Sequence, residues 1–92
     1  MFRLWGKLVK DSKILKSETQ ERPEEDTRTH KIFNSIEEIC KKWDLSIPIW
    51  LDVNINEFKK MSKTRFYPES FIDDTGFDYM EIQVLEEDEG YK

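Results

Sequence analysis

The chain has 92 residues, of which 37% are hydrophobic and 38% charged, and its formal net charge is −5. This length supports one domain and excludes two, and we expect a modest free energy of unfolding, on the order of 5 kcal/mol. The six Phe, three Trp and three Tyr supply large side chains for a core, which excludes a chain that is disordered throughout.

The single cysteine, Cys40, excludes an internal disulfide and a structural zinc site built on cysteines. The N-terminal residues lack the apolar core of a signal peptide, and no run approaches the length of a membrane span. We therefore expect a soluble, cytoplasmic protein without a membrane partner.

The charge is distributed unevenly along the chain. Residues 1–65 carry fourteen Lys or Arg and eleven Asp or Glu, a net of +3, whereas residues 66–92 carry one Lys and nine acids, a net of −8. Residues 86–89 are four acids in a row. We expect residues 1–85 to form a single domain and residues 86–92 to form an acidic C-terminal tail.

The N-terminal region predicts a β-hairpin. Residues 2–9 alternate between two sides of a strand, the polar residues 10–13 predict a turn, and residues 14–20 can extend again. Gly6 inside the first strand indicates either a bulge or a close approach of another backbone.

The strongest helical pattern lies in residues 27–43. Its apolar side chains follow the spacing of one helix face: Ile32, Phe33, Ile36, Ile39, Cys40 and Trp43. Asp26 or Thr27 is the expected N-cap. A capping-box pattern that starts at Ser35 leaves open a later start, with residues 29–33 extended.

The next segments predict a connection and a second, shorter helix. Residues 45–51 contain a proline and are too short for a helix, so we expect an extended and partly buried connection. The second helix begins near Asp52, with Ile55, Phe58 and Met61 as its inner face.

The C-terminal third predicts an irregular segment and then a strand. Residues 63–72 contain a proline and are expected to be irregular. Residues 77–85 alternate, with Met80, Ile82 and Val84 on one side and Glu81 on the other.

The predicted order is β-β-α-α-β. It indicates an α+β fold with a three-stranded antiparallel sheet, made of the hairpin and the C-terminal strand, and two helices packed on one face. The exposed side of the last strand would place Glu81 near Arg3 or Lys7, where opposite charges on neighbouring strands contribute up to about 1 kcal/mol.

The candidate catalytic and metal motifs fail on spacing. Residues 52–56 resemble the start of a calcium loop, but the positions that require Gly and Glu hold Glu57 and Lys63. His30 and Cys40 lie about 15 Å apart along one helix axis, too far for a hydrogen bond. We expect Cys40 to be a core residue, and the chain to have no catalytic residue, cofactor or metal ligand.

The basic hairpin is the candidate interaction surface. Its residues are Arg3, Trp5, Lys7, Lys10 and Lys13. Trp5 shares a strand side with Arg3 and Lys7, and an exposed tryptophan is a common centre of binding energy at an interface.

Six segments of the chain resemble a family of short uncharacterised proteins of Gram-positive anaerobic bacteria. They are LWGKLVKD (4–11), DTRTHKIF (26–33), IEEIC (36–40), PIWLD (48–52), EFKKMSKTRF (57–66) and FDYMEIQVLEED (77–88). The resemblance spans nearly the whole chain and implies one self-contained domain of bacterial, cytoplasmic origin. It implies no activity, cofactor or site residue.

The leading hypothesis is a small non-enzymatic interaction domain that binds a protein partner or itself. One alternative is nucleic-acid binding through Arg3, Trp5, Lys7 and Lys13, because a basic strand with an aromatic side chain can stack bases and follow phosphates. Another alternative is that the acidic segment mimics nucleic acid and binds a basic protein surface. An enzyme would require a cleft that holds an Asp or Glu with a strongly shifted pKa.

Overall fold

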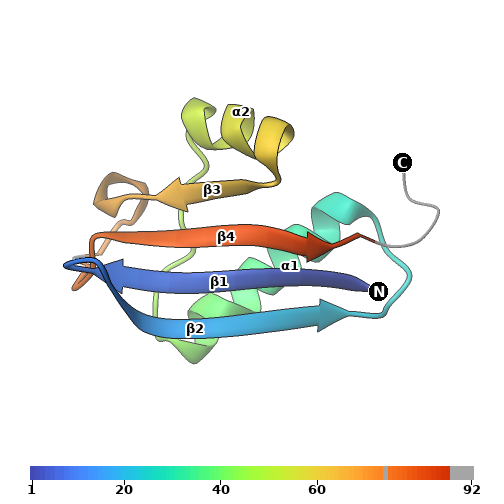
Figure 1. Ribbon diagram of the computed structural model, residues 1–92, viewed down its shortest axis with the longest axis horizontal. Coiled ribbons are helices and arrows are strands. Elements are labelled where there is room, and N and C mark those ends of the chain that lie inside the picture. The colour runs from blue at the N-terminus through green and yellow to red at the C-terminus, as the bar shows by residue number, and fades with distance from the viewer. Residues whose placement is uncertain (74, 88–92) are drawn as a thin grey trace.

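The computed structural model describes residues 1–73 and 75–87, and within them it shows four strands and two α-helices (Figure 1). The strands are β1 (Phe2–Lys10), β2 (Lys13–Arg22), β3 (Lys63–Phe66) and β4 (Tyr79–Glu86), and the helices are α1 (Arg28–Lys42) and α2 (Asp52–Met61). A single 3-10 turn is described at Pro68–Ser70. The strands form one antiparallel sheet in the order β2-β1-β4-β3. The predicted α+β class with an antiparallel sheet is confirmed.

The fourth strand corrects the sequence-based prediction, because residues 63–66 form β3 and are not irregular. Thr64 and Phe66 point into the core, and β3 pairs with β4 so that Phe66 lies opposite Met80. A four-residue strand shows only two inward positions, so its alternation is too short to be recognised without its partner strand.

The hairpin between β1 and β2 turns through Asp11 and Ser12. Both residues have positive φ angles, 51° and 65°, as a two-residue turn of type I′ requires. Gly6 packs against α1, and a Cβ at this position would be 2.9 Å from Ile39 Cδ1. The close approach at Gly6 is therefore that of a side chain and not of the predicted second backbone, and the register shift with β2 falls elsewhere, between Leu8 and Val9.

The core lies between α1 and the face of the sheet that α1 crosses (Figure 1). Its buried residues are Phe2, Leu4, Leu8, Ile32, Ile36, Ile39, Cys40, Phe58, Phe66, Phe71, Phe77, Met80 and Ile82. Trp43 and Trp50 pack against this cluster while remaining partly exposed. The core uses the predicted inner positions Met80 and Ile82 and four residues of the predicted stripe of α1, whereas Phe33 of that stripe is 48% exposed.

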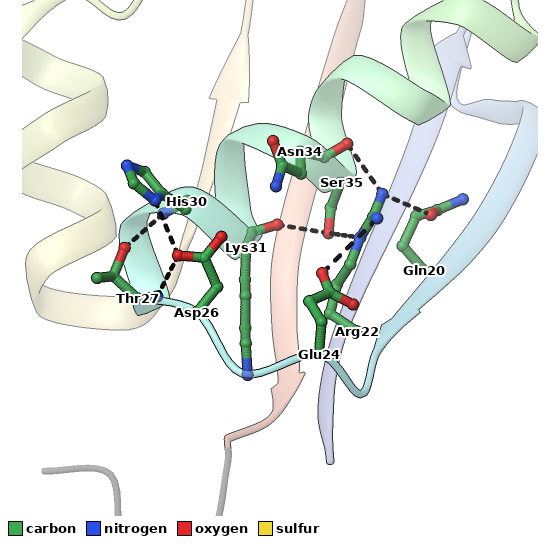
Figure 2. A network of polar contacts seen from close by, with 9 residues as sticks. All are labelled: Gln20, Arg22, Glu24, Asp26, Thr27, His30, Lys31, Asn34 and Ser35. Carbon is green, nitrogen blue, oxygen red and sulfur yellow. Dashed lines mark hydrogen bonds and ion pairs between the residues drawn. The ribbon is translucent and has the colours of Figure 1, made fainter.

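Helix α1 begins at the earlier of the two predicted positions. Thr27 is the N-cap, and its Oγ1 accepts a hydrogen bond from the backbone N–H of His30 at 3.1 Å. Asp26 accepts from the Thr27 N–H at 2.7 Å and from His30 Nδ1 at 2.8 Å, and these two bonds lower the pKa of Asp26 (Figure 2). The later start near Ser35 is wrong, because Ser35 lies buried in the middle of the helix.

Polar side chains attach β2 to α1 (Figure 2). Arg22 donates to Ser35 Oγ at 3.3 Å, to the carbonyl oxygen of Asn34 at 3.0 Å and to Gln20 Oε1 at 3.1 Å. Further along the strand, Glu18 forms an ion pair with Lys42. Strand β2 therefore joins the fold through its pairing with β1 and through these polar contacts, since its own side chains are largely exposed.

Helix α2 lies along β3 at the edge of the sheet, so only α1 crosses the sheet face (Figure 1). The buried Phe58 of α2 joins the core cluster that α1 covers, and Asn54 bonds Thr64, a buried residue of β3, so α2 packs at the edge of the same face. Of the predicted inner face of α2, Phe58 is buried, whereas Ile55 is 39% and Met61 52% exposed. Asn54 fixes the helix to the edge strand, because its amide donates to Thr64 Oγ1 at 3.0 Å and to the Arg65 carbonyl at 2.9 Å.

The C-terminal end of β4 is tied to the rest of the domain by ion pairs. Glu86 pairs with Arg3 at 3.3 Å, and Glu87 pairs with Arg28 at 2.9 Å. The remaining residues of the predicted acidic tail, 88–92, lie outside the described residues. Among the described residues, no helix has the length and apolar character needed to cross a membrane.

Candidate functional site

An apolar groove of about 350 Å³ lies between the first half of α1 and α2. Its lining residues are Arg28, Thr29, Ile32, Phe33, Trp50, Ile55, Phe58 and Lys59. Most of the lining is aliphatic or aromatic, and the two cationic side chains are one from each helix. A concave apolar surface with a few polar groups at its rim is a common form of binding site.

Trp50 connects the groove to the core through three edge-to-face ring contacts. The ring centroids lie 6.0 Å from Phe33, 5.4 Å from Phe58 and 5.1 Å from Phe66. Phe58 and Phe66 are buried, whereas Phe33 is 48% exposed. The groove therefore has a rigid aromatic floor that the core holds in place, with an exposed phenylalanine on its α1 side.

The connection that leads into α2 adds to the exposed apolar surface. Ile47, Ile49, Leu51 and Val53 are all exposed, and Ile55 follows on the groove side of α2. These four residues lie outside the groove lining, and exposed apolar residues that gather in one stretch of chain are typical of an interaction surface.

One end of the groove is basic. The Arg28 guanidinium lies 5.4 Å from the Phe58 ring centroid, donates to Ser62 Oγ at 3.4 Å, and forms the ion pair with Glu87. Lys59, one residue after Phe58, also lines the groove. Arg28 begins α1 and lies beside the end of α2, whereas Phe33, further along α1, contacts Trp50 just before α2 begins. The two helices therefore run in broadly opposite directions on the two sides of the groove.

The outer face of the sheet, opposite α1, has a different character. Lys7 on β1, Glu81 on β4 and Arg65 on β3 lie side by side in register. Glu81 accepts from Arg65 at 2.8 Å and pairs with Lys7 at 3.5 Å. The predicted proximity of Glu81 and Lys7 is confirmed.

Aromatic rings cover this row of charges. The Lys7 ammonium lies 4.9 Å from the Trp5 ring centroid, and the Arg65 guanidinium lies 4.4 Å from that of Tyr79. Burial alone would raise the pKa of Glu81, but the bonds to Arg65 and Lys7 outweigh it, and the pKa lies below its usual value. Glu81 is therefore ionised at neutral pH, with each carboxylate oxygen paired to a different cation, which does not suit it to proton transfer.

The predicted hairpin residues do not form one surface. Arg3, Trp5 and Lys7 alternate along the outer face, where Arg3 pairs with Glu21 and Glu86, and Trp5 donates to Ser17 Oγ at 2.6 Å. Lys10 and Lys13 lie opposite each other at the hairpin end, on the strand side that β1 directs toward α1. The structure thus brings three of the five residues together and leaves two elsewhere.

The remaining candidates from the sequence have structural roles. Asn54, from the calcium-like pattern, accepts from the Leu51 N–H at 2.9 Å through its side-chain oxygen and binds β3 through its amide. Cys40 is buried in the core, and burial raises the pKa of its thiol to about 11. Within residues 1–73 and 75–87, no group of three His, Cys, Asp or Glu is placed to hold a metal ion.

A smaller pocket of about 240 Å³ lies beside β3, between α2 and the outer face. Its polar groups already bind one another, since Glu57 accepts from Thr64 Oγ1 at 2.7 Å and Glu81 accepts from Arg65. This pocket therefore has fewer polar groups free to bind a ligand, and the groove is the better candidate for a binding site.

The sequence-based reasoning missed the groove because it assigned Phe33 and Ile55 to the inner faces of their helices. Ile32 and Phe33 are adjacent and so lie about 100° apart around the helix. An apolar stripe of this width is ordinary for a helix packed on a core, so the sequence held no signal that Phe33 stays exposed.

No protein-family model, curated protein or solved structure matches the chain.

Proposed function

We propose that this chain is a non-enzymatic protein-interaction domain whose binding surface is the groove between α1 and α2. The observation that carries the proposal is the groove itself. Phe33 and Ile55 are partly exposed over a floor formed by Trp50, which the core holds rigidly. Rigid aromatic anchors lose little conformational entropy on binding, and such residues supply much of the energy of protein interfaces.

The outer face of the sheet is a weaker candidate for an enzyme active site than the groove is for a protein-binding site. Its most buried carboxylate, Glu81, has a lowered pKa and two cationic partners. A general acid or base at neutral pH requires a pKa shifted toward 7 instead. The only cysteine of the chain is buried, with its pKa raised, which is the opposite of an activated thiol.

Nucleic-acid binding by the hairpin is also less well supported. Arg3 and Lys7, which would contact phosphates, already pair with Glu21, Glu86 and Glu81. A phosphate would have to displace these carboxylates, so the counterion release that drives binding to nucleic acid would be small.

Site-specific photocrosslinking in the cells of origin tests the proposed surface. A photoreactive benzoylphenylalanine replaces Phe33 in one variant and Ile14 in the other. Ile14 is a matched control, because it is 55% exposed and lies on the hairpin, outside the groove. We expect protein adducts from position 33 and none from position 14. Adducts from position 14 alone, or none from position 33, would overturn the proposal.

A further inference from the structure

We propose that the groove between α1 and α2 binds a second copy of this chain, and that the two copies form a symmetric dimer. This inference rests on the proposed function, since it names the partner of the same surface. It is carried by the distribution of charge along the two helices that form the groove.

The first step concerns α2. Ile55 and Lys59 both line the groove, and Asp52 lies three residues before Ile55. Residues at positions i, i+3 and i+7 share one side of a helix, so Asp52, Ile55 and Lys59 form a row along the groove. The row runs from an acid through an apolar residue to a base over about 10 Å.

The second step concerns α1. Thr29 and Phe33 line the groove, and Glu37 follows at the same spacing of four residues. Because α1 and α2 run in opposite directions, Glu37 lies toward the same end as Asp52, and Arg28 lies at the end of Lys59. The two helices therefore carry two acids, Glu37 and Asp52, beyond one end of the apolar groove lining, and two bases, Arg28 and Lys59, within the lining at the other end.

These charges are available for a partner. Glu37, Asp52 and Lys59 are all exposed, and none of the three forms an ion pair with another described residue. This contrasts with the outer face of the sheet, where Arg3, Lys7 and Arg65 all have carboxylate partners.

A surface with this pattern is complementary to itself. A two-fold axis that passes beside Phe33 and Ile55 brings the basic end of each copy onto the acidic end of the other. Ile55 lies about midway between Asp52 and Lys59 along α2. If α2 contacts its symmetry mate in an antiparallel arrangement centred near Ile55, Lys59 of each copy faces Asp52 of the other. The apolar residues then meet at the centre, where burial contributes most.

The size of the surface is compatible with a dimer. A stable interface removes about 600 to 800 Å² from each partner. The chain exposes 6020 Å² in total, so roughly a tenth of its surface would suffice. The groove lining, with the exposed Phe33 and Ile55 at its sides, provides apolar residues for part of such an area.

The test is a charge swap followed by sedimentation equilibrium across a concentration series from the micromolar range upward. We expect the wild-type protein to form a dimer within this concentration range. Lys59→Asp and Asp52→Lys should each raise the dimer dissociation constant roughly tenfold or more, since each change occurs twice in the interface. The double variant restores opposite charges and should recover most of the wild-type dimer constant. Lys16→Asp, an exposed lysine of β2 outside the groove, is the control and should leave the constant unchanged.

Circular dichroism confirms that each variant is folded, and Phe33→Asp provides an independent disruption of the interface centre. Wild type that stays monomeric at every concentration, or a dimer that both single reversals leave intact, would overturn the dimer. If the chain is monomeric while position 33 crosslinks to a different protein, the interaction domain stands and self-association fails. If position 33 yields no adduct of any kind, both proposals fail.

Discussion

The outer face of the sheet and the groove between α1 and α2 use similar residues in opposite ways. On the outer face, Lys7 and Arg65 flank Glu81, and aromatic rings cover the cations, so charge and apolar surface satisfy each other within the domain. In the groove, Phe33 and Ile55 remain partly exposed. Of the charged residues at its ends, only Arg28 has a partner of opposite sign among the residues that the structure describes. A surface rich in charged and aromatic residues can therefore have its polar groups paired within the domain. The groove, where Phe33 and Ile55 stay partly exposed, is the better candidate for a binding site.

The largest expected effect concerns the residue that links the groove to the core. Trp50→Ala removes three edge-to-face ring contacts, and we expect it to lower the free energy of unfolding by about 3 kcal/mol. Urea unfolding followed by circular dichroism measures this change. Trp5→Ala, on the outer face, is the matched control and should cost about 1 kcal/mol, for one hydrogen bond and one cation–π contact. Equal losses would show that Trp50 does not hold the floor of the groove.

The second effect sharpens the view that the outer face is satisfied internally. Glu81→Gln leaves Lys7 and Arg65 without their shared carboxylate, and we expect a loss of about 2 kcal/mol at neutral pH. The pKa of Glu81 is lowered in the folded state, so its contribution is present above the unfolded pKa near 4.5 and is lost as the pH falls through the lower folded value. Unfolding curves of wild type and variant should thus converge in acid. A difference that persists at low pH would contradict the assignment to charge.

The smallest effect on stability is expected in the groove itself. Phe33→Asp removes a half-exposed ring, and we expect the free energy of unfolding to change by less than about 1 kcal/mol while binding through the groove is lost. Ile14→Asp, at similar exposure on the hairpin, should change neither quantity appreciably. Thermal unfolding and sedimentation of both variants make the comparison. A Phe33→Asp variant that loses several kcal/mol would mean that Phe33 belongs to the core, as its place in the helical stripe had suggested.

Much of the fold followed from local patterns. The alternation of residues 2–9 and 77–85, the stripe of α1 and the N-cap at Thr27 are all readable over short stretches of chain, and the structure confirms them. Strand β3 was missed because its four residues are defined by pairing with β4, which lies outside any local window. The candidate surface was less predictable, since Lys10 and Lys13 share a hairpin with Lys7 in the sequence yet point to the other side of the sheet.

The sequence by itself determined the α+β class, the hairpin turn and the long first helix, because hydrophobic period and capping residues act within a few positions. Tertiary structure alone decided which apolar residues are covered. Phe33 and Ile55 have the spacing of core residues, but α1 rests on the sheet through Ile36 and Ile39 and α2 lies at the edge beside β3. No helix or strand within residues 1–73 and 75–87 covers the space between them. A helical pattern specifies which residues share a side, whereas the packing of the whole chain decides how much of that side is buried.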